Sequence, residues 1–133
     1  MNKKIAKIVC TSLLLTMIIA TNVFAAGKKN YKAYKLPAFQ KNNYSGTHIK
    51  ENTRDYITNQ VNAISHTGTV TFWAANAKHT QISEDYYQKE GNMSKLKFKT
   101  RGYNKKGKQV CMGMENYDWS FGTAFVSGWA NFH

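Results

Sequence analysis

The sequence predicts an all-β fold, a small antiparallel β-sandwich or open barrel that follows a cleaved signal peptide. Three observations predict this class. Turn signals that contain glycine divide the chain into segments of strand length, at residues 45–46, 67–69, 90–92, 104–107 and 121–122. One segment alternates apolar with basic residues, as a half-buried strand does. The last segment is apolar on both faces, which a single sheet could not bury, and no segment has a convincing long helical pattern.

Residues 1–25 have the profile of a secretory signal peptide. Three lysines among the first seven residues precede an uncharged apolar run over residues 8–20. That run is shorter than the roughly 20 residues of a membrane span, and the alternative, an uncleaved anchor helix, is therefore the weaker one. Cleavage after Ala25 would place Val23 and Ala25 where signal peptidase requires compact side chains. We expect a protein that is secreted, either extracellular or associated with the cell surface.

The mature chain is a single, strongly basic domain. The whole sequence holds 19 Lys and Arg against seven Asp and Glu. The leader removes three of the basic residues and no acid, so sixteen minus seven leaves a net charge of +9. Of two cysteines only Cys111 remains, which rules out an intramolecular disulfide. Its neighbours Val110 and Met112 favour an inert core thiol, and a reactive or dimerising thiol is the alternative.

The first half of the mature chain contributes two predicted strands. Residues 26–35 are basic and lack an aliphatic pattern, so we predict an N-terminal tail that leads into one β domain over residues 36–133. Residues 56–65 are ambiguous, because three aliphatic residues keep helical spacing while asparagine and threonine disfavour a helix. We choose a strand there. Thr69 to Ala75 is β-branched and aromatic, and it is predicted to form the next strand.

Leu96 to Arg101 is the clearest strand of the second half. Its apolar side chains alternate with basic ones, so one face is buried and the other cationic. Gln109 to Tyr117 is predicted to be its hairpin partner across the turn at residues 104–108, with a buried side that carries Val110, Met112 and Met114. Thr123 to Phe132 is predicted to be a central strand, or one whose aromatic side meets a partner.

Four short motifs resemble a known family. They are Lys35–Phe39, Asn42–Gly46, Thr67–Trp73 and Val126–Trp129. Together they resemble a group of small exported proteins of Gram-positive bacteria that is classed as a domain of unknown function. The resemblance covers nearly all of the mature chain and implies its fold and compartment, and it carries no catalytic residue over. These proteins are similar in kind to the lactococcin-class bacteriocins, which are secreted, cationic β proteins rich in glycine and aromatic residues.

Basic residues form the main candidate binding site. On a strand, alternate side chains share one face at intervals of about 6.6 Å. Outside a Gram-positive cell the abundant polyanions are teichoic acids and anionic lipid headgroups, so the expected partner is an anionic cell-wall polymer or membrane surface and not cytoplasmic nucleic acid. The alternative is a solvated lysine face that protects a sheet edge. The candidate residues are Lys95, Lys97, Lys99, Arg101, Lys105, Lys106 and Lys108.

Aromatic residues form the second candidate site. Trp73 and Trp129 are expected in the core, but Trp119 lies in the predicted turn at residues 118–122, where burial is difficult. Trp119 and Phe121 are therefore the candidate aromatic contacts, for sugar rings or for a bilayer interface.

Enzymatic chemistry has little support in the sequence. None of the four histidines pairs with another at metal-ligand spacing, and we expect no cofactor or metal. The best enzymatic hypothesis is a small secreted nuclease with Glu115 as general base and His133 as general acid. Three hypotheses follow: a non-enzymatic protein that binds anionic cell-envelope components, a bacteriocin-like secreted toxin, and a small secreted nuclease.

Overall fold

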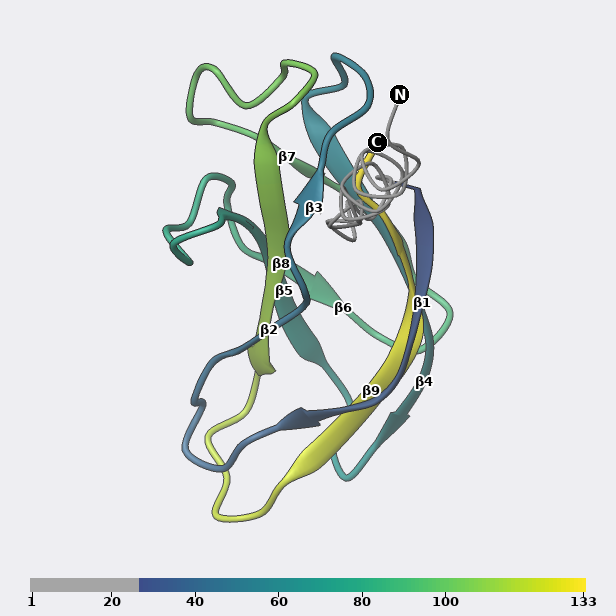
Figure 1. Cartoon of the computed structure of the whole chain (residues 1–133). Helices are drawn as coiled ribbons and strands as arrows, with labels where there is room; N and C mark the ends of the chain where they lie inside the picture. Colours follow the sequence, from purple (N-terminus) through teal and green to yellow (C-terminus); the bar gives the residue numbers. More distant parts are fainter. Residues whose placement is uncertain (1–26) are drawn as a thin grey trace, which may run out of the picture.

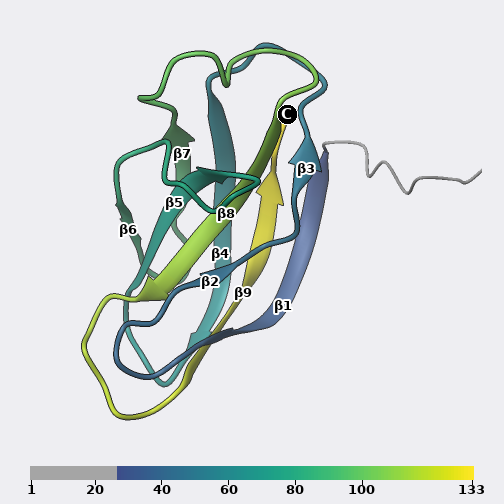
Figure 2. The ribbon, with the colours of Figure 1, turned by 60° about the vertical axis from the view of Figure 1, so that its left-hand side comes forward.

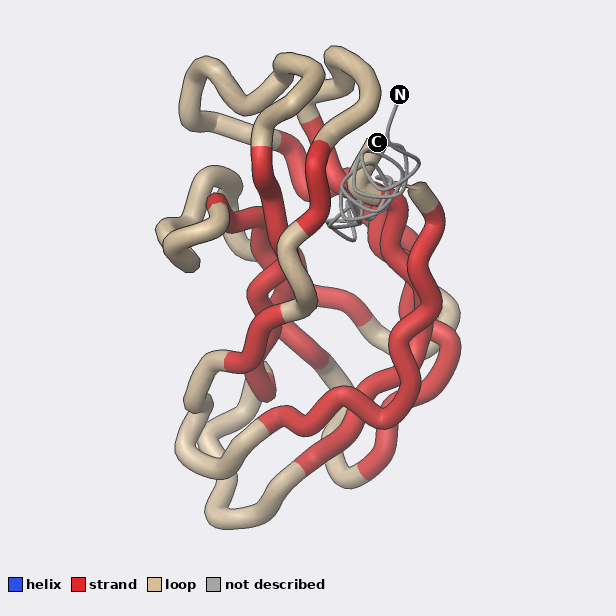
Figure 3. Tube along the Cα trace, in the orientation of Figure 1, coloured by secondary structure: helices blue, strands red, loops and turns tan. Residues whose placement is uncertain are grey.

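The fold is all-β, with nine strands in two antiparallel sheets that pack face to face and do not close into a barrel (Figures 1 and 3). This computed structural model describes residues 27–133, so the predicted signal peptide, residues 1–25, lies outside the described residues. The prediction of a small antiparallel sandwich is confirmed. Within residues 27–133 there is no helix long and apolar enough to cross a membrane.

One sheet has four strands, and the C-terminal strand is central in it. The strand order is β1 (Lys28–Leu36), β9 (Ala124–Asn131), β4 (Tyr56–Ser65) and β7 (Met93–Lys97). Two predictions are confirmed here, because residues 56–65 form a strand and β9 has a neighbour on each side.

The second sheet has five strands and is centred on β8 (Gln109–Asn116) and β5 (Val70–Asn76). β6 (Tyr86–Gln88) pairs with the free side of β5. Two short strands, β2 (Asn43–Tyr44) and β3 (His48–Ile49), follow one another along the free side of β8. Figure 2 shows β2 crossing in front of β8 and β3 lying beside it.

The predicted N-terminal tail over residues 26–35 is wrong. β1 is an edge strand that pairs with β9 from Lys28 opposite Asn131 to Leu36 opposite Ala124. Pairing of this kind uses backbone groups and needs no aliphatic pattern, and lysines on an edge strand also oppose further strand addition. Tyr31 anchors the strand, because its ring is buried and its hydroxyl donates to Asn59 Oδ1 at 2.9 Å.

The predicted hairpin between Leu96–Arg101 and Gln109–Tyr117 is also wrong. β7 pairs with β4 in one sheet, whereas β8 pairs with β5 in the other, so residues 98–108 cross from sheet to sheet. Alternation identifies the buried face of a strand but not its partner. Leu96 of β7 and Met112 of β8 face the same core from opposite sheets.

The core lies between the sheets and is aliphatic, aromatic and methionine-rich. Its members include Leu36, Ile57, Val61, Phe72, Leu96, Val110, Met112, Met114, Val126 and Phe132. Cys111 faces away from this core and is buried in a smaller cluster with Trp73. Burial raises the pKa of the Cys111 thiol to about 11, which disfavours the reactive thiolate. A buried thiol is therefore confirmed.

Candidate functional site

The first two candidate cations lie on the outer face of an edge strand. Lys95 and Lys97 of β7 pair with Thr58 and Tyr56 of β4. Both lysines are exposed, and Leu96 between them is fully buried. The alternation is therefore confirmed for these two residues. It places both ammonium groups in solvent, where they are free to meet an anionic partner.

The predicted four-cation strand face is wrong, because β7 ends at Lys97. Phe98 packs against the core, and its backbone amide donates to the carbonyl of Asp55 at 2.7 Å. Lys99 then donates its backbone amide to Ile82 at 2.8 Å, which draws the chain away from β4. A turn follows in which Gly102 has a φ of 95°, a left-handed conformation that favours glycine. Lys99 and Arg101 therefore belong to the crossover between the sheets.

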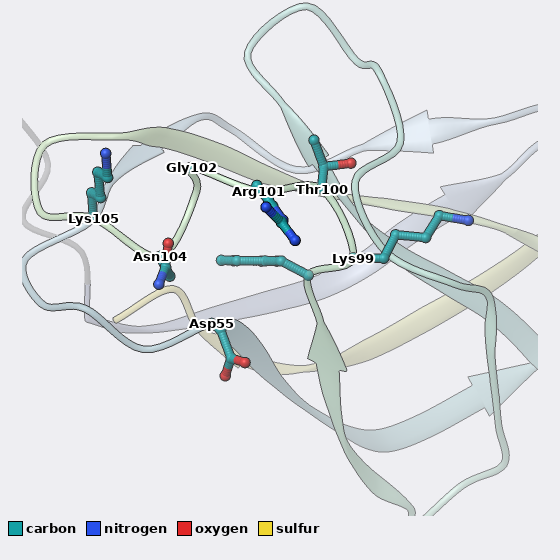
Figure 4. A pocket seen from close by; sticks show the side chains of 8 residues that line it. Asp55, Lys99, Thr100, Arg101, Gly102, Asn104 and Lys105 are labelled. Carbon is teal, nitrogen blue, oxygen red and sulfur yellow. The ribbon is translucent and has the colours of Figure 1, made fainter.

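The crossover surrounds an open cleft of about 540 Å³ (Figure 4). Its lining includes Lys99, Arg101 and Lys105, with Asp55 as the acidic member. Figure 4 shows Lys99 and Lys105 on opposite sides of the cleft, with Arg101 between them. The Lys99 ammonium donates to the Glu84 carboxylate at 2.8 Å, but both side chains are well exposed, so this ion pair contributes little to stability.

The remaining predicted lysines lie around the same crossover. Lys105 and Lys106 are exposed. Lys108 lines a second hollow, of about 400 Å³, together with Lys78. Figures 1 and 2 show the loop between β7 and β8 at one end of the sandwich, next to the loop between β3 and β4. The basic residues are thus brought to one end of the molecule and not to one strand face.

Two further cations at this end escape the sequence analysis. Arg54 Nη1 donates to the Tyr56 hydroxyl at 3.0 Å, and Lys95 Nζ lies 5.0 Å from the centre of the same ring. Lys50 is 1% exposed, and its Nζ lies 5.3 Å from the centre of the Phe98 ring. No sequence signal connects these residues with β7, because the loop that carries them is distant in the chain.

Charge at this end acts on a histidine. The His133 Nε2 lies 3.0 Å from Thr58 Oγ1. Burial lowers the pKa of His133, and Arg54, Lys50 and Lys95 lower it further by repelling an added proton. Three cations from two segments therefore raise the local electrostatic potential together. We call this region the cationic end and define it by its exposed cations: Arg54, Lys95, Lys97, Lys99, Arg101, Lys105, Lys106 and Lys108.

The aromatic candidates lie at the opposite end of the sandwich. The loop between β1 and β2 and the loop between β8 and β9 lie there side by side (Figures 1 and 2). Phe39, Trp119 and Phe121 pack on one another, with ring centres 4.8 to 5.7 Å apart. Their exposed fractions are 46%, 58% and 80%. We call these three residues the aromatic tip.

The other tryptophans do not join the aromatic tip. Trp73 is buried against Gly113, where any side chain would collide with its ring. Trp129 lies half-buried on β9, and Lys28 Nζ sits 4.4 Å from the centre of its ring. Sequence reasoning found Trp119 and Phe121 but missed Phe39, which comes from a loop about 80 positions earlier in the chain.

The structure does not bring the proposed nuclease pair together. Glu115 is in β8 of the five-stranded sheet, where burial and the nearby Asp85 raise its pKa. His133 follows β9 of the other sheet and contacts Thr58 and Tyr56. Within residues 27–133 no group of three or more His, Cys, Asp or Glu side chains could hold a metal ion.

Comparisons of the chain with protein families, with curated proteins and with solved structures find no match. The cationic end and the aromatic tip therefore have to be interpreted from their own geometry.

Proposed function

We propose that the mature protein is a secreted, non-enzymatic protein that attaches to anionic polymers of the bacterial cell envelope through its cationic end. One observation carries the proposal. Eight exposed cations gather at one end of the sandwich, and the one salt bridge among the described residues, between Lys99 and Glu84, neutralises only one of them. Such an excess of unpaired charge attracts polyanions over distances of about a Debye length.

The form of the cationic end suits a polymer better than a small ligand. Its cations come from the loop before β4, from β7 and from the crossover, and three of them line an open cleft of about 540 Å³. Flexible lysine side chains can follow the repeated phosphates of a chain without fixed geometry. A polyol-phosphate polymer such as a teichoic acid meets these conditions, and a surface of anionic lipid headgroups presents the same phosphate chemistry.

A pair of matched charge reversals tests the proposal. Lys97→Glu, Arg101→Glu and Lys105→Glu together should weaken binding to purified poly(glycerol phosphate) by about 100-fold, since each reversal replaces an attraction with a repulsion. The control is Lys32→Glu, Lys35→Glu and Lys41→Glu, which makes the same change in net charge on exposed residues elsewhere. It should weaken binding about tenfold less. Equal losses in the two variants would show that net charge alone matters, and an unchanged affinity in the first would refute the proposal.

A secreted antibacterial toxin is the second candidate, and the exposed aromatic tip favours it. Charge at one end and exposed rings at the other would let a toxin approach an anionic cell and then disturb its surface. We expect purified mature protein to inhibit the growth of susceptible Gram-positive cells if this is its role. Full growth at micromolar protein, with the protein bound to the cells, would leave attachment as the function.

A further inference from the structure

The three rings of the aromatic tip form an apolar knob and not a flat platform. Trp119 and Phe121 meet edge to face at 75°, and Phe39 meets Phe121 at 84°. Sugar rings stack on a flat aromatic surface, and here the three rings are inclined to one another by 49° to 84°. Exposure nevertheless rises to 80% at Phe121. The knob therefore presents apolar area to solvent with no single plane for a sugar.

Several polar groups of the two loops are paired within the tip. The Phe39 amide donates to the carbonyl of Ser120 at 2.8 Å and joins the loops. Gln40 Nε2 donates to the carbonyl of Tyr117 at 2.6 Å. The amide of Gly122 donates to Ser120 Oγ at 3.0 Å. Polar groups that are already hydrogen-bonded lose little free energy when water is removed. Unpaired polar groups are costly to bring into an apolar environment.

The backbone at Phe39 and Gln40 has an unusual conformation. Phe39 and Gln40 have φ values of 63° and 53°, in the left-handed region that residues other than glycine rarely adopt. This backbone conformation places the Phe39 ring on Trp119 and Phe121 and the Gln40 side-chain amide on the Tyr117 carbonyl. Strain of this kind persists where surrounding contacts hold it, and it accumulates at sites of contact with partners.

From these observations we propose that the aromatic tip is a membrane contact that seats in the boundary between headgroups and acyl chains of an anionic bilayer. Tryptophan and phenylalanine in a compact apolar knob favour that boundary. The polar groups that are paired within the tip lower the cost of entering that boundary. The loops of the tip carry one cation, Lys41, and one anion, Asp118, and Lys35 is the next-to-last residue of the strand that enters the tip. The mature chain, with 16 basic and seven acidic residues and hence a net charge of +9, is drawn to an anionic bilayer.

The contact differs in kind from the proposed attachment of the cationic end, because it depends on apolar burial. A variant can therefore lose polymer binding at the cationic end and keep membrane contact at the tip, or the reverse. A tip seated in the bilayer would leave the opposite, cationic end directed away from the membrane, toward polymers of the wall.

The experiment uses Trp119 as the reporter. A Trp129→Phe variant leaves Trp119 as the exposed tryptophan, since Trp73 is only 4% exposed. Vesicles of phosphatidylglycerol and phosphatidylcholine should shift its emission to shorter wavelength, and brominated lipids should quench it. Phe39→Ser with Phe121→Ser in this background should weaken partitioning by about tenfold or more, because both side chains lose their apolar burial. Met93→Ser is the control, because Met93 is 58% exposed, like Trp119, but lies on β7.

Three results would overturn the membrane contact. Vesicle binding without quenching by brominated lipids would show that the tip stays in water. Equal partitioning of the double serine variant and its parent would show that the rings are not needed. A shift of Trp119 emission with soluble peptidoglycan fragments, or with protein concentration alone, and none with vesicles would indicate a glycan or a second copy as the occupant. Loss of poly(glycerol phosphate) binding in the charge-reversal variant tests the cationic end separately.

Discussion

The two ends of the sandwich differ in how their side chains are held. At the cationic end the ammonium groups stand apart in solvent, and the ion pair between Lys99 and Glu84 is exposed. At the aromatic tip three rings touch one another and the two loops share hydrogen bonds. Charge acts at a distance and tolerates loose geometry, whereas apolar contact acts only where surfaces meet. The same small fold can therefore present one surface of separate, solvated charges and one surface of side chains fixed by mutual contact.

Salt should separate the two ends by the largest margin. Raising the salt concentration from about 50 to about 200 mM should weaken binding to poly(glycerol phosphate) by about 100-fold, because each neutralised phosphate releases a counterion. Quenching of Trp119 by brominated lipids in vesicles already bound should change less than about twofold, because apolar burial is insensitive to salt in this range. An equal effect of salt on polymer binding and on Trp119 quenching would show that the two ends do not bind by different forces.

Single alanine substitutions should show that side-chain contacts stabilise the aromatic tip more than the cationic end. Gln40→Ala removes the hydrogen bond to the Tyr117 carbonyl and should lower the free energy of unfolding by about 1 kcal/mol. Lys105→Ala removes an exposed side chain of the cationic end and should change that free energy by less than about 0.5 kcal/mol.

Urea denaturation measures both free energies. The relaxed tip of the Gln40 variant should also show greater Trp119 mobility by fluorescence anisotropy. A larger loss from Lys105→Ala than from Gln40→Ala would reverse the assignment of the two ends.

His133 provides the smallest and most local test of the cationic end. Its pKa is lowered in the folded state, so the unfolded chain binds the proton more readily as pH falls below the usual histidine value of about 6.5. The contribution of His133 to stability is therefore present above that pH and is lost as the pH falls. Binding of poly(glycerol phosphate) should offset Arg54, Lys50 and Lys95 and raise the pKa of His133. An NMR titration of the ring with and without the polymer measures this, and an unchanged or lower pKa would place the polymer elsewhere.

Local patterns in the sequence predicted much of the fold. Alternation around Leu96 identified the inner face of β7, and β-branched and aromatic residues identified β5. Such local patterns did not predict which strands pair with one another. β1 has no aliphatic pattern because its edge position leaves most of its side chains to solvent, and β7 and β8 are adjacent in the chain but belong to different sheets.

The sequence by itself determined the basic charge, the all-β class and the identity of most of the exposed cations and rings. Composition and a two-residue period are local properties, so they need no knowledge of partners. Only the tertiary structure decided that Arg54 joins Lys95 at the cationic end and that Phe39 completes the aromatic tip. These residues come together because the sheets pair strands that are distant in the chain. Sheet topology therefore places charge at one end and exposed aromatic rings at the other.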